Sequence, residues 1–388
     1  MTLPLDGVRI IAVEQYGAGP FGTQHLADLG AEIIKIENPE GSGDVGRSVG
    51  PYFFGEGDSH FHQSFNRNKK SVTLDLKSAE GRADFLALVA TADATFDNLR
   101  GDLPAKLGLT FEALREINPA IVCCHLSAYG REGERAAWPG YDYLMQAEAG
   151  YLSLTGEPEG PPARFGISII DMMTGTMSAL ALTSALIGAR ATGVGRDIDV
   201  SLFDVAMHNL SYFATWYLNE GVVTGRAPRS AHPSLTPSQL YRTADGWIFI
   251  MCNKEKFWTV LCERLGRSDL AAEPRFARFE DRLAHRDELT EILDAAFLTD
   301  TTANWMGRLG GHVPAAPVND IAQALDTPFV RQQGIVTQVK HPTRGSISTM
   351  ACPIRVPGET LPCHPAPKLG QDNDILLPRK PEAGRRRT

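Results

Sequence analysis

The sequence predicts an α/β protein in which a larger domain built on a parallel β-sheet is joined to a smaller α+β domain. With 388 residues, the chain exceeds the usual size of one hydrophobic core, so two domains are expected. Strand-like and helix-like runs alternate over the first half, which indicates parallel strands with helices on both faces of a sheet. From Gln239 to about Val318 the pattern changes to short strands followed by amphipathic helices, which indicates a second unit.

The elements of the large domain are predicted from apolar runs and from the glycines that separate them. They are strand Val8–Val13, a helix ending near Gly30, strand Ala31–Glu37, strand Ser71–Leu76, helix Ala79–Ala90, strand Ala94–Asn98, helix Phe111–Ile117, strand Ala120–Leu126, a turn and strand over Gly193–Val200, and helix Leu202–Glu220. Between the second and third strands, Glu40–Lys70 is predicted to be a long functional loop.

The small domain is predicted from its amphipathic helices and the short strands before them. Its elements are strands Leu240–Thr243 and Trp247–Met251 and helices Lys254–Leu265, Arg286–Phe297 and Thr302–Leu309, followed by a hairpin over Ile335–Lys340 and Ser346–Met350. We therefore expect a large domain over residues 1–220, a linker over 221–238, a small domain over 239–322, and a return to the large domain with a C-terminal tail over 323–388. The basic end of that tail, Arg379–Thr388, is predicted to be disordered.

The composition is that of a globular enzyme. Hydrophobic residues make up 43% and charged residues 22% of the chain. The 46 acidic residues outnumber the 38 lysines and arginines, which argues against nucleic acid as the main partner.

The cysteines and the N-terminus indicate a cytoplasmic protein. The six cysteines show no C-x-x-C spacing, which favours reduced thiols. Asp6 and Arg9 interrupt what would be the apolar part of a signal peptide. His60 and His62 are too few ligands for a metal site, so no metal is expected.

Asp171 lies where an apolar run, Ile167–Ile170, meets a long apolar helix predicted over Met172–Ala189. One interpretation is a helix N-cap, the commonest role of aspartate at such a place. Another is a nucleophile, because the positive end of the helix would keep the carboxylate ionised. The helix is long enough to suggest a membrane span, but its Thr, Ser and Gly residues favour a buried core helix.

The first strand is followed by a G-x-G-x-x-G run, Gly17–Gly22, and the second strand ends in an acidic residue, Glu37. This pattern is close to the dinucleotide fingerprint, so a nicotinamide or flavin oxidoreductase is one open alternative. A pyrophosphate of coenzyme A would suit the same helix N-terminus equally well.

Several segments along nearly the whole chain resemble the class III coenzyme A-transferases of the CaiB/BaiF type, a family that includes the α-methylacyl-CoA racemases. The matching runs are PLDGVRI, GAGPFGTQHLADLGAEIIKIENPEGSGD, NRNKKSVTLDLK, GYDYLMQAEAG, the Asp171 helix, TGVGRDIDVSLFD and PAPKLGQ. The resemblance implies a Rossmann-like large domain formed by both ends of the chain, a small domain between them, and an interlocked homodimer. It also implies that CoA moves between an acyl-CoA and a free carboxylic acid through an aspartyl anhydride and thioester.

The resemblance also assigns site residues. The family's nucleophile falls on Asp171, and its CoA-contacting positions fall on Gln15, Tyr16, Gly17, Ala18, Gly19, Leu74, Asn98, Leu99 and Lys106. Gly17 and Gly19 are candidate oxyanion donors, and Lys106 is a candidate phosphate ligand. Leu99 lacks the family's usual aromatic ring at that position. Gly17 replaces a polar residue of some transferases, which argues against an oxalate or formate assignment.

Tyr141 separates two activities of this family. The resemblance implies a Gly-His-Asp motif in the racemases, with histidine as a base. This chain has Gly140, Tyr141 and Asp142 at that motif. An unperturbed phenol, with a pKa of about 10, is a poor base at neutral pH. The transferase is therefore favoured over a 2-methylacyl-CoA racemase, and a non-catalytic CoA-binding protein is a further alternative.

The expected substrates are an acyl-CoA and a carboxylate. No permanently bound cofactor is expected, and neither nucleic acid nor a membrane is expected as a partner. The sequence does not identify the acyl donor or the acceptor. Arg47, Arg164 and Arg229 are candidates for the distal carboxylate of a dicarboxylic acyl group, although solvated arginine is the commoner explanation for each.

Overall fold

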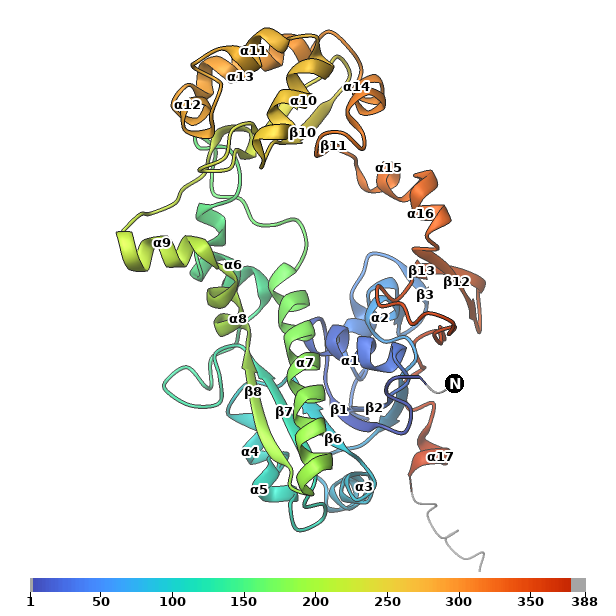
Figure 1. Cartoon of the computed structure of the whole chain (residues 1–388). Helices are drawn as coiled ribbons and strands as arrows, with labels where there is room; N and C mark the ends of the chain where they lie inside the picture. Colours follow the sequence, from blue (N-terminus) through green and yellow to red (C-terminus); the bar gives the residue numbers. More distant parts are fainter. Residues whose placement is uncertain (1–2, 378–388) are drawn as a thin grey trace, which may run out of the picture. The chain divides into compact units, whose positions relative to one another are not determined.

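The computed structural model describes residues 3–377 (Figure 1). The predicted disorder of Arg379–Thr388 lies outside these residues. The chain groups into two compact units. Unit 1 contains Met1–Ala149, Gly166–Ser211 and Phe329–Thr388, and unit 2 contains Gly150–Phe165 and Tyr212–Pro328. Residues 150–165 were predicted to belong to the large domain, whereas their contacts group them with unit 2.

Unit 1 is built on a six-stranded parallel sheet with the strand order β5-β2-β1-β6-β7-β8. The strands are β1 (Arg9–Val13), β2 (Glu32–Glu37), β5 (Lys70–Thr73), β6 (Ala94–Asp97), β7 (Val122–Ser127) and β8 (Arg196–Ser201). The order reverses between β1 and β6, so the carboxyl ends of these two strands form a topological switch point. Ligands of open α/β sheets bind at such a point.

Helices cover the sheet, as the alternation of strands and helices predicted. Strand β1 is almost wholly buried, as is typical of a parallel strand with both faces covered. Over one face, the helix α3 (Ala79–Val89) contributes Phe85 to a core that includes Ile11 and Ile34. On β7 and β8 lies α7 (Ile169–Thr192), which also packs against α1 (Ala18–Asp28).

Glycines bring α1 and α7 into close contact. A Cβ atom on Gly22 would lie 2.4 Å from the carbonyl oxygen of Gly175, and one on Gly175 would lie 2.4 Å from that of Ala18. Only glycine permits this backbone approach. The crossing fixes the N-terminal half of α7 beside the start of α1.

Helix α7 packs on the core along one side, as expected of the predicted core helix, and its other side is exposed. By length and its mean hydropathy of 1.4, it is the one described helix that could cross a membrane. It nevertheless buries residues along its whole length, including Thr174, Ser178 and Leu182, and it packs on α1 and the sheet.

The region Glu40–Lys70 was predicted to be a long loop, but it contains short regular elements. It contains η1 (Val45–Ser48), β3 (Phe53–Gly55), β4 (Asp58–Ser59) and α2 (His60–Phe65). These elements are too short for a periodic pattern to reveal them. Side chains from this region instead enter the interior of unit 1, as the contacts of Asp44 and Asn66 show below.

The remaining elements of unit 1 are short. They are α4 (Leu103–Lys106), α5 (Phe111–Leu114), α6 (Asp142–Glu148), α8 (Leu202–Asn209), the antiparallel hairpin β12 (Val336–His341) and β13 (Gly345–Met350), and α17 (Asn373–Leu376). The hairpin was predicted. The single helix predicted over Leu202–Glu220 is instead α8 and α9 (Tyr212–Glu220), because Ser211 has a φ of 54° and interrupts the helix.

Unit 2 is a small α+β unit, as predicted. Its antiparallel sheet has the order β11-β10-β9, formed by Ala315–Pro317, Trp247–Met251 and Ser238–Arg242. Its other elements are η2 (Tyr151–Ser153), η3 (Pro228–Ser230), α10 (Glu255–Leu265), α11 (Ser268–Ala272), α12 (Phe279–Ala284), α13 (Arg286–Phe297), α14 (Thr302–Leu309) and α15 (Ile321–Leu325), and α16 (Pro328–Gln332) begins at its boundary with unit 1. The predicted bounds of β10, α13 and α14 are confirmed.

Candidate active site

The loop after β1 lies at the switch point of the sheet and is tied to the end of β6. The main-chain N–H of Gln15 donates to Asn98 Oδ1 (2.9 Å), and Asn98 Nδ2 donates to the carbonyl oxygen of Gln15 (2.7 Å). A Cβ atom on Gly19 would lie 2.8 Å from the Asn98 side chain. Asn98 therefore fixes the path of the loop, and Gly19 leaves room for it.

Asp171 lies in the first turn of α7, directly against this loop. A Cβ atom on Gly17 would lie 2.6 Å from Asp171 Oδ2, so the backbone of Gly17 faces the carboxylate. Asp171 is 6% exposed. Two positions named from the sequence, Gly17 and Asp171, are thus in direct contact.

Asp171 is not the N-cap that its position in the sequence suggested. The helix begins at Ile169 with Ser168 as the N-cap, so Asp171 is the third helical residue. Its main-chain N–H donates to Asp142 Oδ2 (2.9 Å). Asp142, from another helix, thereby supplies the acceptor that a capping side chain would provide.

The charge state of Asp171 also differs from the prediction. Burial raises the pKa of Asp171 to about 7, with a further rise from the nearby charge of Asp142. We expected the helix dipole to keep the carboxylate ionised, but desolvation in a nearly closed position outweighs that effect. A carboxyl group that titrates near neutral pH at a sheet switch point is typical of a functional site.

Tyr16 lies near this carboxylate and contacts a second tyrosine, Tyr141. Burial raises the pKa of Tyr16, and the charge of Asp171 raises it further. The rings of Tyr16 and Tyr141 meet edge to face, with their centroids 6.0 Å apart. Tyr141 is 61% exposed and is therefore open to a ligand.

The G-x-G-x-x-G run serves the fold at two of its glycines. Helix α1 begins at Ala18, so Gly19 and Gly22 lie within it. Gly22 permits the contact with α7 and Gly19 the contact with Asn98. Glu37 is buried and accepts from Arg47 (2.6 Å) and from Ser71 Oγ (2.6 Å), so it is not presented to a ribose. The oxidoreductase alternative therefore lacks the acidic residue that would bind the ribose of a dinucleotide.

The remaining predicted CoA contacts, Leu74, Leu99 and Lys106, follow the carboxyl ends of β5 and β6 in the chain. Leu74 is 5% exposed and belongs to the core, and Leu99 packs against the same core. Lys106 is exposed and pairs with Asp102 (2.6 Å). Two surface hollows occur here. One, of about 810 Å³, is lined by Leu74 among others. The other, of about 500 Å³, is lined by Leu76, Lys77, Arg82, Ala105, Lys106, Leu107 and Gly108.

Two of the three arginines considered for a substrate carboxylate are already paired. Arg47 is buried against Glu37 and donates to the carbonyl oxygen of Pro367 (3.1 Å), so it is not a solvated arginine. Arg229 pairs with Asp294 (2.5 Å). Both arginines therefore form structural ion pairs.

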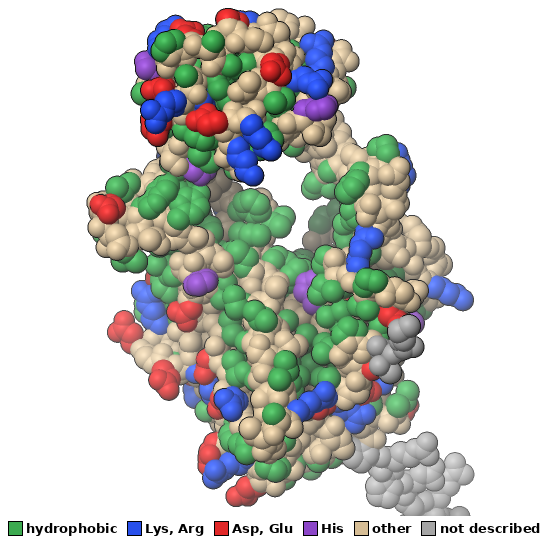
Figure 2. Space-filling model, viewed as in Figure 1, with side chains coloured by type: hydrophobic (Ala, Val, Ile, Leu, Met, Phe, Trp, Pro, Cys, Tyr) green, Lys and Arg blue, Asp and Glu red, His purple; other side chains and the backbone are tan. Residues whose placement is uncertain are grey.

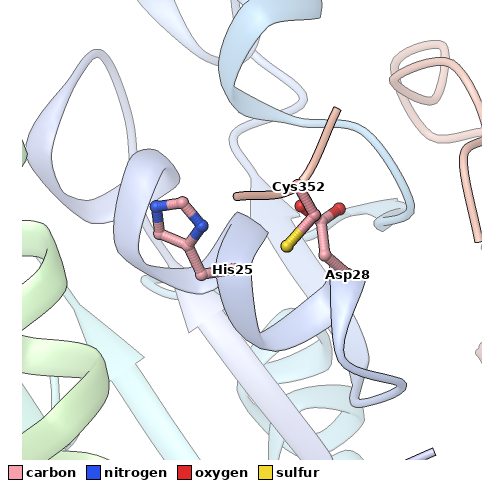
Figure 3. Close-up of side chains that lie close together, drawn as sticks. All are labelled: His25, Asp28 and Cys352. Atoms are coloured by element: carbon pink, nitrogen blue, oxygen red, sulfur yellow. The ribbon is translucent and has the colours of Figure 1, made fainter. Parts of the chain in front are cut away.

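A group with metal-ligand chemistry occurs elsewhere, at His25, Asp28 and Cys352 (Figure 3). Asp28 already accepts from Arg67 Nε (2.8 Å) and from Asn68 Nδ2 (2.7 Å). The guanidinium supplies the positive charge that a metal ion would supply, so this group is built as an ion pair.

Three buried charged residues near the site, Asp142, Asp44 and Lys35, were not predicted from the sequence. Lys35 gave a signal, because a lysine in the apolar strand β2 needs a buried partner. Asp44 gave none, because its bond from the main chain of Tyr16 joins residues 28 positions apart.

The family model described as CoA-transferase family III matches residues 5–373. The chain is 35% identical to succinate–glutarate CoA-transferase of Agrobacterium fabrum, over 96% of this chain and 95% of that one. It is 34% identical to acetyl-CoA:oxalate CoA-transferase of Acetobacter aceti, over 96% and 95%. The crystal structure of a CaiB/BaiF family protein from Brucella suis superposes with a TM-score of 0.83 and 33% identity, over 96% and 98%.

Proposed function

Because this chain belongs to CoA-transferase family III, we propose that it moves CoA between an acyl-CoA and a free carboxylate, with Asp171 as the nucleophile. One observation carries the proposal. Asp171 is buried, faces the main chain of Gly17 and lies at the switch point of the sheet. The first turn of α1 adds N–H groups that have no acceptor within the helix.

The proposed reaction conserves the thioester bond through two acyl exchanges on Asp171. The carboxylate attacks the thioester carbonyl, the C–S bond breaks, and CoA thiolate leaves with the electron pair, which gives a mixed anhydride. The thiolate then attacks the aspartyl carbonyl, releases the donor acid and forms an aspartyl-CoA thioester. The acceptor carboxylate reverses both steps and leaves as its CoA ester. Every bond that breaks is replaced, so no oxidant or ATP is required.

The residues around Asp171 have distinct roles in this proposal. The main-chain N–H groups of Gly17 and Gly19 are the candidate donors to the tetrahedral oxyanions. A carboxyl group with a pKa of about 7 is a stronger nucleophile, once ionised, than one with an ordinary pKa. Tyr16 lies near Asp171 and its ring contacts that of Tyr141, and this pair is proposed to limit the access of water, which would hydrolyse the anhydride.

The basic hollow formed by Lys77, Arg82 and Lys106 is the proposed site of the CoA phosphates. The side chain of Lys106 is 65% exposed, so a phosphate can compete with Asp102 for it. Leu74 borders the neighbouring hollow, where the adenine is proposed to lie. CoA should therefore raise the melting temperature, and NAD should not.

The names of the relatives bear on the substrates. One acts on succinate and glutarate and another on acetyl-CoA and oxalate, so dicarboxylates occur in both names. We propose a dicarboxylic acid on at least one side of the reaction. Gly17 lacks a polar side chain to hold the second carboxylate of a short diacid, which favours glutarate or succinate over oxalate.

The test is direct assay of CoA exchange. Purified protein is incubated with succinyl-CoA or acetyl-CoA and each of glutarate, succinate and oxalate, and the CoA esters are separated by chromatography. A new CoA ester in stoichiometric exchange for the old one supports the proposal. Solvent deuterium appearing at the α-carbon of a 2-methylacyl-CoA, without exchange, would instead identify a racemase.

We also propose that the protein is an interlocked homodimer. Helix α7 presents Leu180 (59% exposed) and Ile187 (73% exposed) on its outer face. Figure 2 shows apolar side chains over the part of unit 1 where Figure 1 places α7. Light scattering should give a dimeric mass that persists on dilution, and a folded monomer would contradict the proposal.

A cytoplasmic location is proposed as well. All six cysteines are free thiols, and Cys123 and Cys124 are buried without pairing although they are adjacent. Free thiols are expected in a reducing compartment. Cell fractionation tests this, and recovery of the protein outside the cytoplasm would contradict it.

A further inference from the structure

Tyr16, the residue before Gly17, has a strained backbone. Its φ is 67°, which is the left-handed region. A bulky residue remains there only where its surroundings impose the conformation. The main-chain N–H of Tyr16 donates to Asp44 Oδ1 (2.9 Å). Since Gly17 faces Asp171, this contact decides how the loop lies against the nucleophile.

Asp44 is fixed at both carboxylate oxygens. It is 2% exposed. Oδ1 accepts from the main chain of Tyr16 and of Gly46 (2.7 Å), and Oδ2 accepts from Lys35 Nζ (2.7 Å). The two oxygens therefore have separate roles, one holding the loop and the other anchoring the side chain.

Lys35 belongs to a buried network that returns to the same loop. Its side chain is 0% exposed, and its Nζ also donates to Asn66 Oδ1 (3.0 Å). Asn66 Oδ1 accepts a second bond from Lys69 Nζ (3.1 Å), and Lys69 Nζ donates to Glu14 Oε1 (2.7 Å). Glu14 and Tyr16 are the two ends of one short stretch, so the network holds both.

Two wholly buried lysines are costly unless their charges serve a purpose. Nothing in the sheet itself requires them, since a pair of apolar residues would pack at the same positions with less desolvation. One carboxylate partner, Asp44, binds the main chain of the loop after β1, and the other, Glu14, is the first residue of that loop. This arrangement favours a role at the site over a role in general stability.

We propose that Asp44, anchored by Lys35, is a positioning residue that holds Tyr16 and thereby sets Gly17 against Asp171. The inference rests on the proposed function, because its consequence is a loss of turnover. Asp44 acts through Tyr16 and contributes no atom to the reaction. Its removal should lower the rate of the chemical step and leave acyl-CoA binding unchanged.

The test compares Asp44→Asn with a matched control, Asp28→Asn. Asp28 is also fully buried and also pairs with a cation, Arg67, at 2.5 Å, but it lies at the other end of α1. Each change removes one buried carboxylate charge. We expect kcat to fall about 100-fold in Asp44→Asn with KM unchanged, as a displacement of about 1 Å at the site would produce. The control should retain kcat.

A second variant and a second readout keep the inference testable. The double variant Asp44→Leu/Lys35→Met removes both charges and also the oxygen that accepts from Tyr16, so no unpaired charge is buried, yet kcat should remain low. Hydrogen exchange of the peptide covering residues 14–22 should rise in both Asp44 variants and stay unchanged in Asp28→Asn.

The two readouts separate this inference from the proposed function. If the wild-type protein transfers no CoA, the proposed function fails, while hydrogen exchange still reports whether Asp44 holds the loop. If the wild type transfers CoA but Asp44→Asn keeps its kcat and its exchange protection, the positioning role is overturned. A fall in kcat that is equal in Asp28→Asn would also overturn it, because general destabilisation would then be the cause.

Discussion

Replacing Asp171 with asparagine should inactivate the protein and stabilise its fold. The amide cannot attack a thioester, so turnover should fall by several orders of magnitude. The stability change follows from the pKa of Asp171, which burial and then Asp142 raise from 3.8 to about 7. At about 1.4 kcal/mol for each pKa unit, ionisation in the folded protein costs roughly 4 kcal/mol more than in the unfolded chain.

The pH window follows from the sign of that shift. Because the folded pKa lies above the unfolded one, the cost appears as the pH rises above 3.8 and is complete above about 7. The wild type should therefore be less stable than Asp171→Asn by about 4 kcal/mol at pH 8, and the two should be nearly equal at pH 4. Asp171 is 6% exposed, so solvent screening reduces this difference little.

The assay is urea denaturation of both proteins between pH 4 and pH 8, with CoA exchange measured on the same samples. The difference in unfolding free energy should grow with pH, and activity should be lost at every pH. A difference that is constant with pH would refute the reasoning about burial. An Asp171→Asn protein that still exchanges CoA at near the wild-type rate would refute the nucleophile.

The remaining predictions concern the contacts of Asp171 and of α1. Asp142→Asn removes the second cause of the raised pKa, so the rise of kcat/KM with pH should move to lower pH; an unshifted profile would show that Asp142 has no electrostatic role. Gly17→Ala places a methyl group 2.6 Å from Asp171 Oδ2, so CoA exchange should fall by roughly 100-fold while circular dichroism stays unchanged, and full activity would contradict the contact. Gly22→Ala places one 2.4 Å from the carbonyl oxygen of Gly175, so thermal unfolding should show a loss of about 1–3 kcal/mol, and unchanged stability would mean that α1 and α7 are less closely packed.

The sequence predicted most of the regular elements because their apolar spacing is local. The strand Trp247–Met251 and the helices Arg286–Phe297 and Thr302–Leu309 have the predicted bounds. The apolar strands of the parallel sheet were equally clear. Prediction failed where elements are short or where one backbone angle decides, as at Ser211, whose positive φ divides the helix predicted over Leu202–Glu220.

At the site, the resemblance to a family predicted Asp171 and the loop Gln15–Gly19, and the structure brings Gly17 and Asp171 together. The sequence did not predict the raised pKa of Asp171. Position in a helix is a local property, but burial and the charge of Asp142 depend on a residue 29 positions earlier in the chain. The local rule therefore gave the wrong charge state.

The sequence by itself determined that this is an α/β chain with a parallel sheet, a second small unit and a carboxylate at the start of a long helix. Those features depend on neighbouring residues, whose spacing sets each element. Only the tertiary structure decided the surroundings of that carboxylate. It buried Asp171 beside Asp142, and it joined Lys35 to Asp44 and Asp44 to Tyr16. Such contacts join residues that are separated in the chain and depend on how strands and helices pack, which no local pattern records.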